Sequence, residues 1–268
     1  MTAGTGRAGQ RVTGVRVLRS EWTKLRTLPS TLWLLLAAAV LVVGGGILVC
    51  VLQAGNWPPH DRADIASFDP TAASLTGVYL AQLVVGVLGV LLITGEYATG
   101  AIRVTLAAVP RRLPVLWAKA GALALATLAL CLPATVGAFL GGQYVLSAQH
   151  IGISLTHPGA ARAVLGSALF LTAVGLFGLG LGGLLRNTAA AVAALFGLLF
   201  VLPIVVGLLP GDWSDQLQKY LPYSAGTAIT NAVPGSDSLP PWTGFGVFCL
   251  YAATALGLAA WQLRRRDA

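Results

Sequence analysis

Long apolar runs alternate with short polar segments along the whole chain of 268 residues. A helix needs about 20 apolar residues to cross the hydrocarbon core of a membrane. The runs are continuously apolar and lack the strict alternation of apolar and polar residues that is typical of barrel strands, so they indicate helices. The pattern therefore predicts an all-α membrane protein with six transmembrane helices. These spans cover about residues 31–52, 73–94, 120–146, 163–185, 189–209 and 243–263.

The basic residues gather in every second connection between these runs. Fourteen of the 17 Lys and Arg residues fall in the segments 1–30, 95–119, 186–188 and 264–268. Lys and Arg are retained on the cytoplasmic side of membrane proteins. We therefore expect both termini in the cytoplasm. The basic segments flank spans and form no recognisable binding module, so they suit anionic membrane lipid and indicate no nucleic-acid partner.

Residues 1–30 predict a cytoplasmic tail and an amphipathic helix on the membrane surface, and residues 31–268 predict the six-helix transmembrane domain. The apolar residues recur at helical spacing, namely Val15, Leu18, Trp22 and Leu25. Charged residues fill the other positions, namely Arg16, Arg19, Glu21, Lys24 and Arg26. Such a helix lies in the membrane interface. Two interpretations stay open: a plain lipid anchor, or a surface that also contacts a cytoplasmic protein.

The segment 95–119 joins the second and third spans and has mixed character. Glu96 stands just past the second span, and residues 98–109 could form a short helix with one apolar face. Pro110 would end that helix, and Arg111 and Arg112 follow. The helix would fit a cleft in a partner protein, or the segment would be an interfacial linker whose charges only fix orientation. In the connection 210–242 we expect short helices with aromatic residues at the interface, or a plain surface loop.

The chain carries few residues that point to chemistry of its own. It has no G-x-x-x-x-G-K-[ST] phosphate loop and no H-E-x-x-H motif, so we expect no catalytic site, no cofactor and no metal. The predicted spans hold no carboxylate of the kind a proton-coupled carrier uses. Any energy for uphill transport would come from another protein. The many glycines in the spans favour tight helix packing over a sliding or dimerising surface.

Three groups of residues resemble the ABC-2 type permeases of ABC transporters, particularly actinobacterial ones. The first comprises Ser20–Thr27 and Ser30–Trp33. The second comprises Glu96, Tyr97, Gly100, Ile102, Arg103, Thr105, Leu106 and Pro110–Arg112, with Lys119 beyond. The third comprises Tyr220–Pro222, Ala225, Gly226 and Trp261–Asp267. The three groups occur in the family's order and span nearly the whole chain.

The resemblance implies a six-span subunit of an exporter in the bacterial plasma membrane. It implies a partner P-loop ATPase that carries ATP and Mg²⁺, and a second permease copy or paralogue that completes a dimer. It also implies an ATPase-coupling region at Glu96, Arg103, Arg111 and Arg112, and a hydrophobic or amphipathic substrate such as a drug, peptide or lipid-like molecule. From the residues alone, an ATPase-independent carrier and a non-transporting scaffold or sensor remain alternatives.

Overall fold

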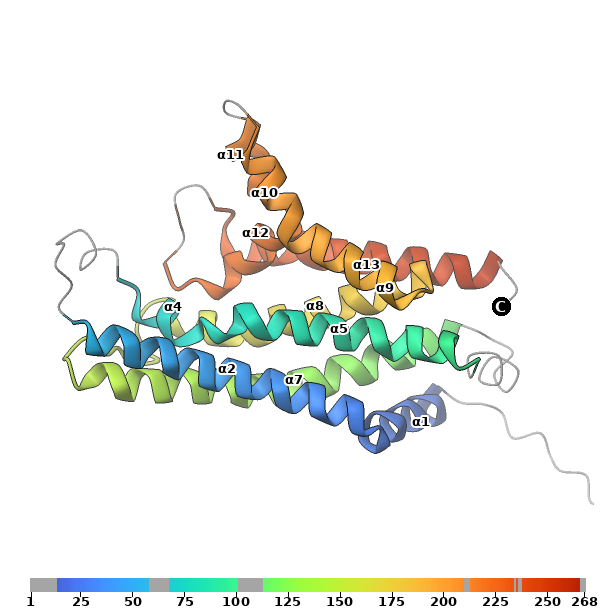
Figure 1. Ribbon diagram of the computed structural model, residues 1–268, viewed down its shortest axis with the longest axis horizontal. Helices are drawn as coiled ribbons and strands as arrows, with labels where there is room; N and C mark the ends of the chain where they lie inside the picture. The colour runs from blue at the N-terminus through green and yellow to red at the C-terminus, as the bar shows by residue number, and fades with distance from the viewer. Residues whose placement is uncertain are drawn as a thin grey trace, which may run out of the picture.

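The computed structural model describes residues 14–57, 68–100, 113–209, 213–233, 235 and 238–265. For residues 14–17 it describes the backbone only. Within the described residues the chain is helical and has no strand (Figure 1). Six segments are long and apolar enough to cross a membrane. The prediction of an all-α membrane protein with six transmembrane helices is confirmed, whereas the orientation of the termini stays a prediction.

The six candidate spans consist of single or joined helices. They are α2 (Pro29–Gly55), α4 with α5 (Pro70–Leu75 and Gly77–Ala98), α7 (Leu113–Ser147), α8 (Ala160–Leu185), α9 with η1 and α10 (Thr188–Phe196, Gly197–Val201 and Leu202–Gly207), and α13 (Pro241–Arg265). The remaining helices are α1 (Gly14–Thr27), α11 (Trp213–Gln218), α12 (Pro222–Thr227) and η2 (Ala228–Thr230). The short helices expected in the connection 210–242 are therefore present.

Proline and short polar side chains set several helix ends. Leu28 is extended, and Pro29 then occupies the first turn of α2, where its missing N–H leaves no bond unmade. This break turns α1 away from the axis of α2. Asp69 caps α4 by accepting hydrogen bonds from the amides of Thr71 and Ala72. Asn187 caps α9 in the same way through the amide of Ala190.

Helix α8 forms the centre of the bundle. Its most apolar stretch is 83% buried, compared with 22% for the corresponding stretches of α2 and of the fifth span. The helices α5, α7 and α13 all pack against it. Glycines make this close approach possible: a Cβ on Gly178 would overlap the backbone of Gly86, and one on Gly89 would overlap the carbonyl of Gly175. These glycines of α8 and α5 therefore serve tight packing, as expected.

One end of the bundle gathers segments that are far apart in the sequence. Helix α1 lies there against α7, beside the end of α5 and the start of α7, and the last turns of α13 reach the same end (Figure 1). Helix α4 and the start of α8 lie at the opposite end (Figure 1). Because α1 meets two spans at one end, that end is where charged residues of the N-terminal segment can contact the bundle.

Candidate functional site

Helix α1 packs against α7 through its apolar residues. Leu18 contacts the buried side chains of Val115 and Ala118. Leu25, two turns further along α1, is only 5% exposed, and Trp22 is half-buried. The apolar face of α1 is thus partly covered by the chain's own α7.

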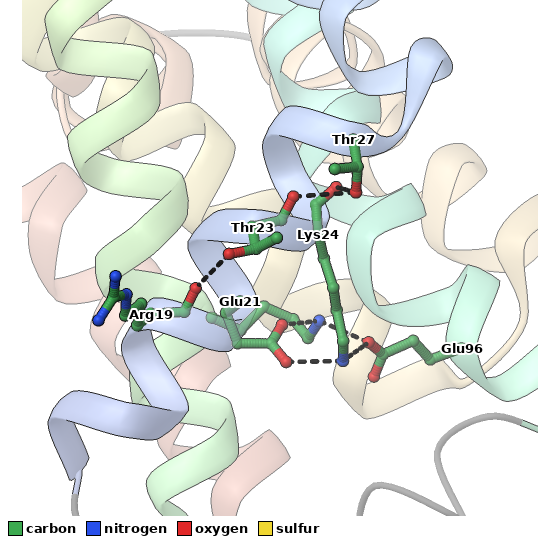
Figure 2. A network of polar contacts seen from close by, with 7 residues as sticks. Arg19, Glu21, Thr23, Lys24, Thr27 and Glu96 are labelled. Carbon is green, nitrogen blue, oxygen red and sulfur yellow. Dashed lines mark hydrogen bonds and ion pairs between the residues drawn. The ribbon is translucent and has the colours of Figure 1, made fainter.

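Four charged side chains from α1, α5 and α7 form a closed set of ion pairs, which we call the ion-pair ring (Glu21, Lys24, Glu96 and Lys119). Lys24 Nζ lies 2.7 Å from Glu21 Oε1 and 3.0 Å from Glu96 Oε1. Lys119 Nζ lies 2.6 Å from Glu21 Oε2 and 2.9 Å from Glu96 Oε1. Figure 2 shows the ammonium group of Lys24 between the carboxylates of Glu21 and Glu96. Acids and bases alternate around the ring, so its formal charge is zero.

The ring is largely removed from solvent. The side chains of Glu21 and Lys119 are 4% and 6% exposed, whereas that of Lys24 is 38% exposed. Burial of a charge is costly unless a partner and hydrogen bonds compensate it. Each lysine donates to both glutamates, which provides this compensation. Only Glu96 Oε2 is left without a hydrogen-bond partner among the described residues of the ring.

The electrostatic environment stabilises the charged forms on α1. Burial alone would raise the pKa of Glu21, but the attraction of Lys119 and hydrogen bonds from Lys119 and Lys24 outweigh it and hold that pKa below its ordinary value. Burial alone would lower the pKa of Lys24, but its hydrogen bonds to Glu21 and Glu96 and their negative charges raise it. Both groups are therefore charged at neutral pH.

The ring joins two spans that otherwise touch little. Helix α5 packs mainly on α8 and α2, and α7 mainly on α2 and α8, with few direct contacts between α5 and α7. Glu96 on α5 and Lys119 on α7 bridge this gap, and Glu21 and Lys24 hold α1 across it. A displacement of α1 would therefore act on both spans at once.

Some of the predicted site residues meet in the ring, and others lie elsewhere. Glu21, Lys24 and Glu96 come together, while Arg26 is exposed. Three residues of the expected coupling region lie outside the described residues, namely Arg103, Arg111 and Arg112. The structure also shows where Glu21 lies, one of the charged residues between the apolar positions of the predicted helix. That side chain faces α7 and is buried.

Lys119 is the ring member that the sequence analysis missed as a site residue. A signal was present in the composition: Glu21 and Glu96 are the only glutamates of the chain. Both stand in segments dominated by Arg and Lys. A buried acidic side chain next to a span needs a basic partner. Lys119 is the basic residue nearest the third span, so it is the candidate for that partner.

The described residues contain no group of three or more His, Cys, Asp or Glu side chains that could hold a metal ion. The chemistry that the ring itself offers is ionic attachment between helices.

One protein family matches nearly the whole chain. A family model described as ABC-2 family transporter protein matches residues 16–268. No curated protein matches the chain. The matched stretch includes all four residues of the ion-pair ring and all six candidate spans. The chain belongs to the ABC-2 family of transporter proteins.

Proposed function

We propose that this chain is the membrane-spanning permease subunit of an ABC exporter in the bacterial plasma membrane. A separate P-loop ATPase supplies ATP hydrolysis, and a second permease copy or paralogue completes the dimer. Both termini and the ion-pair ring face the cytoplasm, with residues 1–30 as a docking unit on the transmembrane domain 31–268. Family membership supports the assignment to an ABC transporter, and the apolar spans suit a hydrophobic or amphipathic substrate.

The observation that carries this proposal is the attachment of α1 to two spans through the ion-pair ring. Glu96 and Lys119 lie on either side of the segment 101–112, which contains the basic residues of the expected coupling region. An ATPase that contacts α1 and this segment would touch the helix that carries Glu21 and Lys24 and also the segment that connects Glu96 to Lys119. Movement of α1 would pass through the ring to α5 and α7.

The packing of the bundle gives this movement a path to the rest of the subunit. Helices α5 and α7 both pack on the central helix α8, which in turn contacts α13. The glycine contacts between α5 and α8 leave no room for independent motion without repacking. We therefore expect ATPase closure to move the spans as a unit.

Purification of the tagged chain from its host in mild detergent tests the partnership. We expect a P-loop ATPase to copurify in stoichiometric amount, with basal ATP hydrolysis. Deletion of residues 1–28 should weaken this assembly, whereas deletion of residues 1–12 leaves α1 complete and should not. A folded, monodisperse chain without any ATPase would support the carrier or scaffold alternatives instead.

A second test separates coupling from assembly. Glu96→Gln keeps the size of the side chain but removes the charge that both lysines share. We expect ATP hydrolysis to continue while substrate export falls, and we expect the same from Arg103→Ala if the segment 101–112 contacts the ATPase. Asp215→Asn, which neutralises an exposed carboxylate on α11, serves as the control. Wild-type export by the Glu96 variant would move the coupling site elsewhere.

A further inference from the structure

The end of the bundle at which α1 lies has a second feature. It is found between the last turns of α8 and α13. A pocket of about 350 Å³ opens there, lined by Leu184, Leu258, Trp261, Gln262 and Arg265. Its lining combines two aliphatic side chains, an indole, an amide and a guanidinium. The pocket shares no lining residue with the ion-pair ring.

The polar lining residues have unused binding capacity. The guanidinium carbon of Arg265 lies 4.3 Å from the centre of the Trp261 ring, and Arg265 has no ion-pair partner among the described residues. Gln262 Oε1 is buried and accepts no hydrogen bond from any described residue. The pocket lining therefore includes a positive charge without an ion-pair partner and an amide whose buried Oε1 lacks a donor.

The apolar part of the pocket continues onto an exposed face of α13. Leu258 is 51% exposed and Trp261 is 53% exposed, both on a helix that is apolar enough to span. Tryptophan and arginine at the end of a span mark the level of the lipid headgroups. An occupant of this pocket is thus expected to have an anionic, hydrogen-bond-donating head and an apolar tail.

We propose that this pocket binds an acidic phospholipid whose headgroup carries hydroxyl groups, of the phosphatidylglycerol type. Its phosphate accepts hydrogen bonds from the Arg265 guanidinium, which the Trp261 ring holds in place. A headgroup hydroxyl donates to Gln262 Oε1. An acyl chain lies along Leu184 and Leu258. The lipid thereby fills the space between the ends of α8 and α13.

Native mass spectrometry of the full chain in mild detergent tests this site, with dioleoyl-phosphatidylglycerol as the added lipid. We expect the chain to retain this lipid in preference to dioleoyl-phosphatidylcholine. Arg265→Ala should weaken retention about ten-fold, because a charge-assisted bond to phosphate is lost. Arg264→Ala removes the same charge from the neighbouring exposed position, outside the pocket, and should change retention little.

A second arm tests the hydroxyl group. Phosphatidylethanol carries the same charge as phosphatidylglycerol but has no headgroup hydroxyl. We expect wild-type chain to favour phosphatidylglycerol over it, and Gln262→Leu to abolish that preference. Soluble glycerol 3-phosphate should fail to displace the lipid, because it has no acyl chain.

Several outcomes would overturn the proposal. Equal losses for Arg264→Ala and Arg265→Ala would mean general charge attraction without a site. Unchanged lipid retention by Arg265→Ala, combined with loss of a copurifying protein, would assign the surface to a protein partner. Circular dichroism and gel filtration verify folding, and Arg265→Gln replaces the alanine variant if that variant aggregates.

Discussion

Lys119 is the more deeply buried of the two lysines in the ion-pair ring. It is 6% exposed and contacts both glutamates, at 2.6 Å and 2.9 Å. Removal of one member leaves each of its two neighbours with a single ion-pair partner, whereas removal of Glu21 and Lys119 together leaves Lys24 and Glu96 paired with each other. The ring is thus an attachment whose members depend on one another.

This dependence predicts a non-additive mutant cycle. Lys119→Met should destabilise the chain by about 3 kcal/mol, because Glu21 loses its shortest contact while it stays buried. Glu21→Gln combined with Lys119→Met should cost clearly less than the sum of the two single changes. Thermal unfolding of the four proteins in the same detergent measures the coupling. Additive losses would show that Glu21 and Lys119 do not interact.

The charges on α1 predict a pH range in which this helix is attached. The pKa of Glu21 is lowered, so its contribution is present above the ordinary value of 4.5 and is lost as pH falls through the lowered value. The pKa of Lys24 is raised, so its contribution is complete below 10.5 and is lost as pH rises through the raised value. Attachment of α1 should therefore weaken as pH falls below the ordinary pKa of Glu21, 4.5, and as pH rises above the ordinary pKa of Lys24, 10.5.

Spin labels on two exposed positions, Thr23 of α1 and Leu125 of α7, measure this attachment. The distance distribution between them should be narrow at neutral pH and broaden at both extremes. The Glu21→Gln variant should have a broad distribution already at neutral pH. A distribution that stays equally narrow at both pH extremes in the wild-type chain would contradict the role of the ring.

The sequence located the ring residues better than it predicted their contacts. Charge patterning placed Glu96 and Lys24 at the same side of the membrane, which is a property of the chain alone. Their contact depends on how α1 is rotated against α7, and Leu18 fixes this rotation by packing on Val115 and Ala118 of α7, far away in sequence. A helical pattern on one segment cannot contain that information, so it does not predict that Glu21 faces α7.

At the scale of elements, hydropathy predicted the spans because a membrane requires every spanning backbone to be helical. The helix ends are less dependent on hydropathy. Helix α7 begins at Leu113, ahead of the predicted start at residue 120, because a helix can continue past the hydrocarbon core. The fifth span contains the π-helical turn η1 just before Pro203. Proline cannot donate to the helix ladder, and the wider turn adjusts to this loss.

The glycine contacts between α5 and α8 give a prediction at this scale. Gly178→Ala would place a methyl group against the backbone of Gly86, so the two helices must move apart. We expect a loss of about 1–3 kcal/mol in unfolding free energy, measured in detergent. Gly257→Ala is the matched control, because an added Cβ there meets nothing within 4 Å. Equal stability of both variants would show that α5 and α8 are not in close contact.

At the scale of the whole molecule, one end of the bundle carries both proposed binding features. The ion-pair ring joins α1, α5 and α7 there, and the pocket lies between the last turns of α8 and α13. Most of the basic residues that the structure describes also lie at this end. An ATPase would meet the ring, while lipid headgroups meet the pocket. The account requires this end to face the cytoplasm.

The most direct test of that requirement is labelling of single cysteines by a membrane-impermeant maleimide in intact cells. Cys50, Cys131 and Cys249 are first replaced, and a cysteine is introduced either at Thr23 beside the ring or at Ser154 in the connection between α7 and α8. Both positions are exposed. We predict labelling at position 154 in intact cells, and at position 23 only after permeabilisation. Labelling at position 23 in intact cells would place the ring outside, beyond the reach of any cytoplasmic ATPase.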